Sequence, residues 1–304
     1  MRLCVLGGTG FLGRHFCERI QARGQSATTI SRNPDRAFLY ARAPRVTGLT
    51  LGSLEAAAAL KACDVLVHLA STSLPGIGWN DPTAELASST LPEVRFLQDF
   101  CRDNPRARII HASSGGQIYG PGHDRPIEDT SVPAPPTAYA LGKLMVEATL
   151  NLLSAAEGNS VTILRIANPI GRWQLGRKHG FVTTAVQAGL AGKPLTLFGS
   201  GTNVRDYFDA DDFADFLCEL VFASAARAGT YNIGSDRGLT ERDVITIVSH
   251  VIGRPLDIRI NPRRPYDMKY ALLNSQRAKQ ELGWAPTTSL EASILKIRDA
   301  CGTL

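Results

Sequence analysis

Three features of the 304-residue sequence predict an α/β protein built on a doubly wound parallel sheet. Short apolar runs alternate with longer segments of helical periodicity through the first half, which is the pattern of β-α-β units. The runs are continuously apolar, as in Val65-Leu66-Val67-His68-Leu69, and this is typical of strands buried on both faces. The first run leads directly into a glycine-rich turn and a helix. We therefore expect a Rossmann-type sheet with a smaller C-terminal α/β domain.

The elements follow from this alternation. The expected strands are, in chain order, Leu3–Leu6, Ser26–Ile30, Val65–Leu69, Arg108–His111 and Val161–Ile166. The helices expected between them are Phe11–Ala22, Leu54–Ala62, Pro82–Cys101 and Ala138–Ala156. After about residue 167 the elements become shorter, and Gly, Pro and Arg become denser. Helices are expected there at Phe181–Leu190, Asp212–Phe222, Glu241–Val251, Ser275–Leu282 and Leu290–Ala300. The sequence thus predicts a sheet domain over 1–166, with segments near 206–235 returning to it, and a second domain over 167–304.

Composition and charge exclude several classes of protein. Hydrophobic residues make up 44% of the chain and charged residues 20%, which is ordinary for a globular protein. The net charge of +5 is spread along the chain without a long basic run, so it favours a pocket for an anionic small molecule over a nucleic-acid surface. No apolar stretch reaches the roughly 20 residues that span a bilayer, and no signal-peptide pattern opens the chain. The six scattered cysteines are expected to be buried, reduced thiols, and we expect a cytoplasmic protein without nucleic-acid or membrane partners.

The strongest local motif is Gly7-Gly8-Thr9-Gly10-Phe11-Leu12-Gly13, which follows the first strand and opens the first helix. Glycines at 7, 10 and 13 allow a tight turn, a close approach to a pyrophosphate and close packing of helix on strand. The helix N-terminus adds the positive end of its dipole. This context predicts a dinucleotide-binding domain over residues 1–166. The expected cofactor contacts of this segment are Gly7, Thr9, Gly10, Phe11, Leu12 and Gly13.

The end of the second strand bears on the choice of dinucleotide. It reads Thr29-Ile30-Ser31-Arg32-Asn33 and lacks the acidic residue that usually binds a free ribose 2′-hydroxyl. Arg32 and Arg14 carry planar guanidinium groups that suit a 2′-phosphate. We expect Arg14, Ser31 and Arg32 to contact an NAD(P) cofactor, with NADP favoured over NAD.

A second motif, Tyr139-Ala140-Leu141-Gly142-Lys143, places a phenol and an ammonium on one helix face. Tyrosine is a poor base at neutral pH, but a nearby ammonium and an oxidised nicotinamide both favour the phenolate. The pair therefore suits general acid–base chemistry beside a nicotinamide.

These motifs stand in the order found in one known family. The sequence resembles the extended short-chain dehydrogenases/reductases, in particular the NAD-dependent epimerases and dehydratases of nucleotide sugars typified by UDP-galactose 4-epimerase. The resemblance covers nearly the whole chain. Its further pieces are His68-Leu69-Ala70, Ser113-Ser114…Tyr119-Gly120, Arg165…Asn168-Pro169, Gly201…Val204-Arg205-Asp206-Tyr207, Asp209…Asp211-Asp212, Arg264…Asp267 and Asn274-Ser275…Ala278…Glu281-Leu282-Gly283-Trp284.

The resemblance implies a role for each matching residue. Tyr139 would be the catalytic acid/base, and Lys143 would support its charge and hold the nicotinamide ribose. Leu69, Ala70 and Ser71 would line the cofactor. Asn168, Arg205, Arg264 and Asp267 would bind a nucleotide-sugar substrate. The family also implies a homodimer formed through the helices Pro82–Cys101 and Ala138–Ala156.

The sequence departs from the family at the strand that precedes the motif Tyr119-Gly120. The position of the usual catalytic Ser or Thr holds Gly115, so we expect Ser114 to supply the catalytic and substrate-binding hydroxyl, with Ser113 as a weaker candidate and no hydroxyl as the third alternative. Gly116 and Gln117 stand where dehydratases carry acids, which disfavours dehydration.

Other polar residues are given simpler interpretations. His68 is expected to be a core histidine, and the loop residue His179 is a weak acid candidate. No metal site is expected. The acidic residues are interpreted as helix caps and loop-ordering groups, and they are Asp206, Asp209, Asp211 and Asp212.

Together these observations favour a nucleotide-sugar 4-epimerase, acting on a UDP-sugar by transient hydride transfer to a bound nicotinamide. Two alternatives remain. Arg32 favours an NADPH-dependent reductase of a keto nucleotide-sugar, in which Tyr139 would act as an acid. Gly115 favours a non-catalytic dinucleotide-sensing protein.

Overall fold

The computed structural model describes residues 1–76, 78–175 and 180–302. The chain divides into two compact units. The sheet unit comprises residues 1–114, 135–165 and 214–231, and the second unit comprises 115–134, 166–213 and 232–304. Compared with the two ranges expected from the sequence, the second unit additionally contains residues 115–134.

A seven-stranded sheet runs in the order β3-β2-β1-β4-β5-β6-β10. Its strands are β1 (Leu3–Leu6), β2 (Ala27–Ser31), β3 (Val46–Thr50), β4 (Val65–His68), β5 (Arg108–Ser114), β6 (Ser160–Ile166) and β10 (Gly229–Ile233). Parallel pairing joins β1 to β2 and β4, β2 to β3, and β4 to β5. The order reverses between β1 and β4, which is the switch point where α/β sheets bind ligands. The expected doubly wound Rossmann-type sheet is confirmed.

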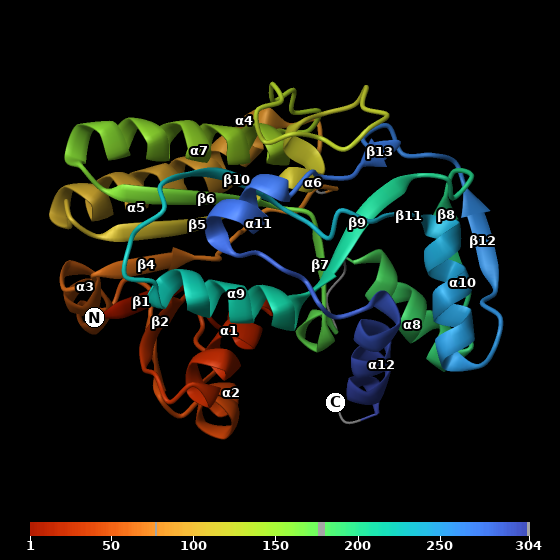
Figure 1. Ribbon diagram of the computed structural model, residues 1–304, viewed down its shortest axis with the longest axis horizontal. Helices are drawn as coiled ribbons and strands as arrows, with labels where there is room; N and C mark the ends of the chain where they lie inside the picture. The colour runs from red at the N-terminus through yellow and green to blue at the C-terminus, as the bar shows by residue number, and fades with distance from the viewer. Residues whose placement is uncertain (77, 176–179, 303–304) are drawn as a thin grey trace. The chain divides into compact units, whose positions relative to one another are not determined.

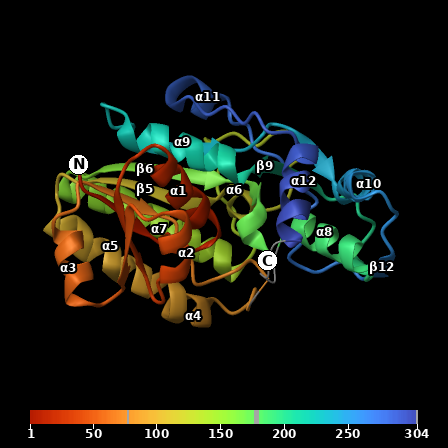
Figure 2. The same cartoon turned by 90° about the horizontal axis from the view of Figure 1, so that it is seen from below.

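Helices cover both faces of this sheet (Figures 1 and 2). They are α1 (Phe11–Ala22), α2 (Arg36–Arg42), α3 (Leu54–Lys61), α4 (Pro82–Glu85), α5 (Leu91–Asp103), α7 (Ala138–Glu157) and α9 (Ala210–Phe222). Figure 1 shows α5 and α7 along one face, where Leu97 and Val146 join the buried strand residues Leu66 and Ile109 in one hydrophobic core. On the other face, an ion pair of 3.2 Å between Arg19 and Asp215 links α1 to α9.

The expected helix Pro82–Cys101 is one helical run with an irregular middle. It consists of α4, a π-helical turn over Leu86–Thr90, and α5. A π-turn inserts an extra residue into the helix, so the residues of α5 are rotated relative to those of α4.

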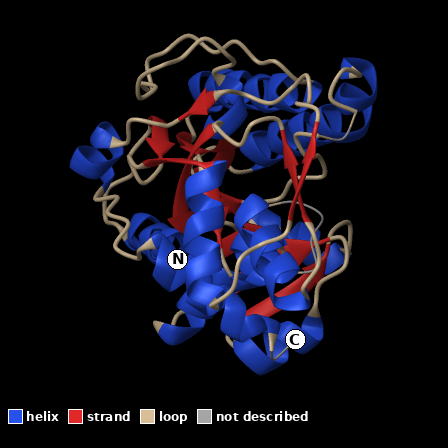
Figure 3. Cartoon of the chain, turned by 90° about the vertical axis from the view of Figure 1, so that its right-hand side faces the viewer, coloured by secondary structure: helices blue, strands red, loops and turns tan. Residues whose placement is uncertain are grey.

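The second unit is built from short strands and three mutually packed helices (Figures 1 and 3). The central strand β9 (Val204–Asp209) pairs with β7 (Asn168–Ile170), β11 (Gly238–Thr240) and β13 (Tyr270–Ala271). β8 (Leu195–Phe198) pairs in parallel with β12 (Ile258–Asn261). The helices are α8 (Phe181–Ala191), α10 (Glu241–Ile252) and α12 (Leu290–Cys301), with shorter helical segments α6 (Gly115–Ile118), η2 (Arg172–Gln174) and α11 (Gln276–Leu282). Val186, Val244 and Ile294, one from each packed helix, lie in the core of this unit.

No helix in the described residues has both the length and the apolar character that a membrane crossing needs. The six cysteines all carry free thiols, and five of them are buried.

Candidate active site

The glycine turn between β1 and α1 brings backbone unusually close to backbone. Gly7 has a φ of +86°, and a Cβ added there would lie 2.8 Å from the amide nitrogen of Ala70. A Cβ on Gly13 would overlap Gly7 and Gly8. The α1 N-cap residue, Gly10, provides no side-chain cap, so the first amide groups of α1 point toward the turn without a side-chain acceptor. This geometry suits a pyrophosphate.

The end of β2 is joined to the glycine turn by polar contacts. Thr9 Oγ1 donates to Ser31 Oγ at 3.2 Å. Arg14 donates from Nε to the carbonyl of Thr9 at 3.1 Å and from Nη2 to Asp35 Oδ2 at 2.5 Å. Arg32 is exposed. The structure thus adds a carboxylate, Asp35, to the group that sequence reasoning assigned to the cofactor.

The end of β4 lies against the same turn. Leu69 donates its amide to the carbonyl of Leu6 at 2.9 Å, and the backbone of Ala70 contacts Gly7. Ser71 follows on the exposed surface. The segment Leu69–Ser71 therefore adjoins the glycine turn at the expected cofactor site.

The α7 helix supplies the tyrosine and the lysine. Thr137 caps α7 by accepting from the amide of Ala140, so Tyr139 lies in its first turn. Tyr139 is half-buried, whereas Lys143 is only 6% exposed. Lys143 Nζ lies 3.7 Å from Glu93 Oε1 and has no hydrogen-bond partner among the described residues.

The two serines at the end of β5 have different surroundings. Ser113 is buried and donates from Oγ to Glu147 Oε1 at 2.5 Å. Glu147 in turn receives a bidentate contact from the buried Arg165, with a shortest distance of 2.7 Å. Ser114 is half-buried, and among the described residues no contact of this kind engages its hydroxyl. Of the two, Ser114 has the hydroxyl that remains available to a ligand.

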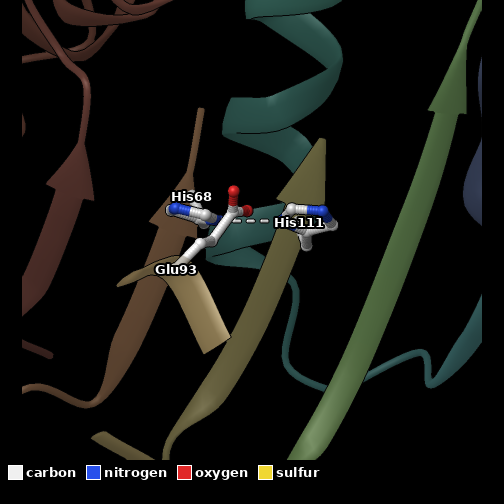
Figure 4. A group of neighbouring side chains, drawn as sticks. All are labelled: His68, Glu93 and His111. Atoms are coloured by element: carbon white, nitrogen blue, oxygen red, sulfur yellow. Dashed lines mark hydrogen bonds and ion pairs between the residues drawn. The ribbon is translucent and has the colours of Figure 1, made fainter. Parts of the chain in front are cut away.

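Glu93, the residue near Lys143, belongs to a largely buried group from three elements, which Figure 4 shows. His68 of β4 and His111 of β5 are register partners, and their Nδ1 atoms lie 2.8 Å apart. Glu93 Oε1 of α5 lies 3.4 Å from His68 Nδ1. Burial lowers the pKa of His68 to about 4, helped by the charge of Lys143 and opposed by that of Glu93. Burial also holds the pKa of His111 well below its usual range. Both imidazoles are therefore neutral near pH 7.

Of the five residues expected to bind substrate, Ser114 ends β5 in the sheet unit, and the other four lie in the second unit. Asn168 Nδ2 donates to the carbonyl of Asp206 at 2.9 Å, which ties β7 to β9. Arg264 clasps Asp267 through both carboxylate oxygens, with contacts of 2.7 and 2.9 Å. Burial lowers the pKa of Arg205, although the nearby Glu241 opposes that shift. The unit thus gathers two fixed guanidinium groups that suit a diphosphate.

The acidic residues of β9 and α9 serve structural contacts. Asp209 accepts from the amide of Asp211 at 2.7 Å, and both carboxylates lie within 3.2 Å of Lys296. Asp212 accepts from the amides of residues 287 and 288. These contacts satisfy the carboxylates in the way expected for capping and loop-ordering groups. His179 lies outside the described residues.

Sequence reasoning missed two carboxylates, Asp35 and Glu93. Asp35 is the N-cap of α2 and accepts from the amide of Phe38, a local signal that the sequence carries. Glu93 precedes Leu97 and Phe100 at helical spacing and therefore stands on the buried face of α5. A charge on an apolar helix face is the signal that could have found it.

Comparison with known proteins gives a consistent result. The model of the NAD dependent epimerase/dehydratase family matches residues 3–234. A UDP-glucose 4-epimerase of Mycolicibacterium smegmatis is 28% identical over 97% of both chains. A dTDP-4-dehydro-6-deoxyglucose reductase of Escherichia coli is 27% identical over 76% of this chain and 73% of its own. The structure of Thermus thermophilus UDP-glucose 4-epimerase in complex with NAD superposes over 100% of both chains with a TM-score of 0.87 and 26% identity.

Proposed function

The chain belongs to the NAD dependent epimerase/dehydratase family, and on that premise we propose that it is a nucleotide-sugar 4-epimerase acting on a UDP-sugar. The observation that carries the proposal is the placement of Tyr139 and Lys143 on α7, in the same unit as the glycine turn. The similarity to UDP-glucose 4-epimerases over nearly the full length supports the choice of reaction.

The nucleotide-binding residues fit a dinucleotide. Gly7 and Gly13 have no room for a Cβ beside the neighbouring backbone, which keeps the turn tight, while Gly10 would let a pyrophosphate approach and the N-terminus of α1 has no side-chain cap. When bound, the nicotinamide supplies a reversible hydride acceptor. Ser31, Leu69 and Ala70 would line the bound cofactor.

The chain's own residues would handle the proton. Tyr139 as phenolate would accept the proton of the sugar hydroxyl at the carbon that is inverted, and would return it at the end of the cycle. Lys143 would stabilise the phenolate through its positive charge. Ser114 would donate a hydrogen bond to the sugar oxygen whose charge changes. Arg205, Arg264, Asp267 and Asn168 would hold the nucleotide part of the substrate.

We propose NAD as the dinucleotide of this reaction. The expectation of NADP rested on Arg14 and Arg32 at the end of β2. Arg14 is paired with Asp35 at 2.5 Å, and a carboxylate near the adenosine ribose favours a 2′-hydroxyl over a 2′-phosphate. Arg32 is then the remaining guanidinium for a 2′-phosphate.

The substitution Tyr139→Phe tests the reaction. We expect the interconversion of UDP-glucose and UDP-galactose, followed by NMR with substoichiometric NAD, to slow by about a hundredfold or more, because the general acid/base is lost. NAD binding should persist, and the control Tyr40→Phe on the exposed face of α2 should behave as wild type. A Tyr139→Phe protein with full biological effect would instead favour a non-catalytic, dinucleotide-sensing role.

A second candidate is an NADPH-dependent reductase of a keto nucleotide-sugar, and the exposed Arg32 at the end of β2 is the observation that favours it. The similarity to a dTDP-4-dehydro-6-deoxyglucose reductase also favours a reductase. Stoichiometric NADPH consumption with a supplied keto-sugar, together with no interconversion of UDP-sugars, would select this function.

We also propose a homodimer formed through α5 and α7. Leu91 on α5 and Leu152 on α7 are 42% and 69% exposed, and the partner subunit would cover them in such an interface.

A further inference from the structure

Four titratable side chains from four elements of the sheet unit converge below the N-terminal half of α7. They are Lys143 of α7, Glu93 of α5, His68 of β4 and His111 of β5. All are largely buried: the two histidine residues are at most 1% exposed, and the side chain of Glu93 is 12% exposed. Burying charged side chains costs free energy of folding unless the charges are paired. The pairing of these charges therefore has to be accounted for.

The histidine pair is uncharged and shares a proton. Two Nδ1 atoms 2.8 Å apart can form a hydrogen bond only when one donates and the other accepts. Two protonated imidazoles would repel each other at this distance, and burial disfavours either cation. Among the charged groups that the structure describes around Lys143, Glu93 is therefore the partner of opposite sign.

The contact between Glu93 and Lys143 is an ion pair and not a tight hydrogen bond. At 3.7 Å the carboxylate attracts the ammonium, yet Lys143 Nζ and Glu93 Oε1 both lack a hydrogen-bond partner among the described residues. The ammonium protons are consequently available to another acceptor. A lysine held in this way is oriented by charge while its donors stay open for a hydroxyl.

The same residues also raise the question of a metal ion, because His68, Glu93 and His111 offer three ligand atoms within 4.8 Å of one another. Two imidazole ligands of one tetrahedral zinc lie about 3.4 Å apart, given zinc–nitrogen distances of about 2.0–2.1 Å. The observed 2.8 Å is a hydrogen-bond distance. The ammonium beside Glu93 would moreover repel a dication.

We propose that Glu93 is a positioning residue that holds the ammonium of Lys143 toward the cofactor ribose and Tyr139, and that the His68–His111 pair keeps Glu93 in place. The inference rests on the proposed function, because it takes Lys143 and Tyr139 as the working pair. Glu93 itself touches neither the substrate nor the cofactor in this proposal and acts through the lysine.

The test is the pH profile of kcat for Glu93→Gln, a substitution that keeps the shape and removes the charge. Loss of a negative charge makes nearby protons easier to lose, so both the acid limb and the alkaline limb of the profile should move to lower pH by about one unit. The matched control is Asp99→Asn, which removes a carboxylate from the exposed face of the same helix and should leave the profile in place.

A kcat that falls by the same factor at every pH would show a merely structural role and overturn the proposal. Glu93→Asp keeps the charge and should restore the positions of both limbs. Binding of one equivalent of Zn²⁺ by the wild-type protein, lost in His68→Gln, would also overturn the proposal and identify a metal site.

A second measurement separates this inference from the proposed function. If the wild-type protein interconverts no UDP-sugar, the proposed function fails, and NAD titration then decides the role of Glu93. Affinity for NAD that is about three- to tenfold weaker in Glu93→Gln and unchanged in Asp99→Asn would support the placement of Lys143 at the ribose. Equal affinities in wild type and Glu93→Gln would refute it.

Discussion

At the scale of single residues, the proposed preference for NAD depends on Asp35. Its carboxylate caps α2 and pairs with Arg14, so a guanidinium that could bind a 2′-phosphate is already neutralised. We expect Asp35→Asn to weaken NAD binding by about tenfold, the effect of losing one hydrogen bond to a charged group. The ratio of NADP to NAD affinity should rise, because Arg14 becomes available.

Titration of both dinucleotides by calorimetry measures this ratio. Asp64→Asn is the control, since Asp64 carries the same charge in the same unit but pairs with Arg2 near the N-terminus. An unchanged ratio in Asp35→Asn would mean that Asp35 is only a helix cap.

The sequence revealed residues whose role depends on local spacing. Gly7 and Gly13 could be predicted because a turn from strand to helix within seven residues leaves no room for a Cβ. Asp35 and Glu93 could not, because each acts on a partner that only folding brings near. Arg14 lies 21 residues from Asp35, and His68 lies 25 from Glu93 in a different element. The choice between Ser114 and Ser113 as the catalytic hydroxyl also depended on folding, because the contact between Ser113 and Glu147 joins residues that are distant in the sequence.

At the scale of elements, α5 and α7 form one layer over the sheet and carry exposed leucines. If these helices meet their counterparts in a homodimer, a charge at Leu152 would be buried without a partner in the interface. We expect Leu152→Glu to shift the protein from dimer to monomer, as measured by sedimentation equilibrium. Leu54→Glu on α3, where Leu54 is 88% exposed, should leave the dimer intact. A wild-type protein that sediments as a monomer would contradict the proposed interface.

Continuously apolar, buried strands were predictable, and some strands of mixed apolar and polar character were not. β1 and β4 appeared as continuous apolar runs because parallel strands are covered on both faces. The edge strand β3 was missed, since Val46–Thr50 mixes apolar and polar residues around a glycine. In the second unit, β9 pairs with segments near residues 168, 238 and 270. No local pattern encodes such pairings, because their stabilisation comes from contacts across the chain.

At the scale of the whole molecule, the two units carry buried groups with opposite responses to acid. In the sheet unit, burial lowers the pKa of His68 to about 4. In the second unit, burial raises the pKa of Asp206 to about 6, against the hydrogen bonds from Ser235. The unfolded chain would restore the ordinary values of both groups, so each one links the stability of its own unit to pH.

The signs of the two effects follow from which state binds the proton first. Between pH 6.5 and 4 the unfolded chain protonates the histidine while the folded sheet unit does not, so this unit loses up to about 3 kcal/mol as the pH falls. In nearly the same range the folded second unit holds a proton on Asp206 that the unfolded chain releases, so acidification favours its folding. We therefore expect the sheet unit to lose stability relative to the second unit between pH 7 and pH 4.5.

Calorimetric unfolding of single-site variants across this range measures the two contributions. His68→Gln should flatten the loss of stability with acid, whereas Asp206→Asn should steepen it, because the compensating proton uptake is gone. Equal pH dependence in wild type and both variants would mean that neither buried group titrates differently in the folded and unfolded chain.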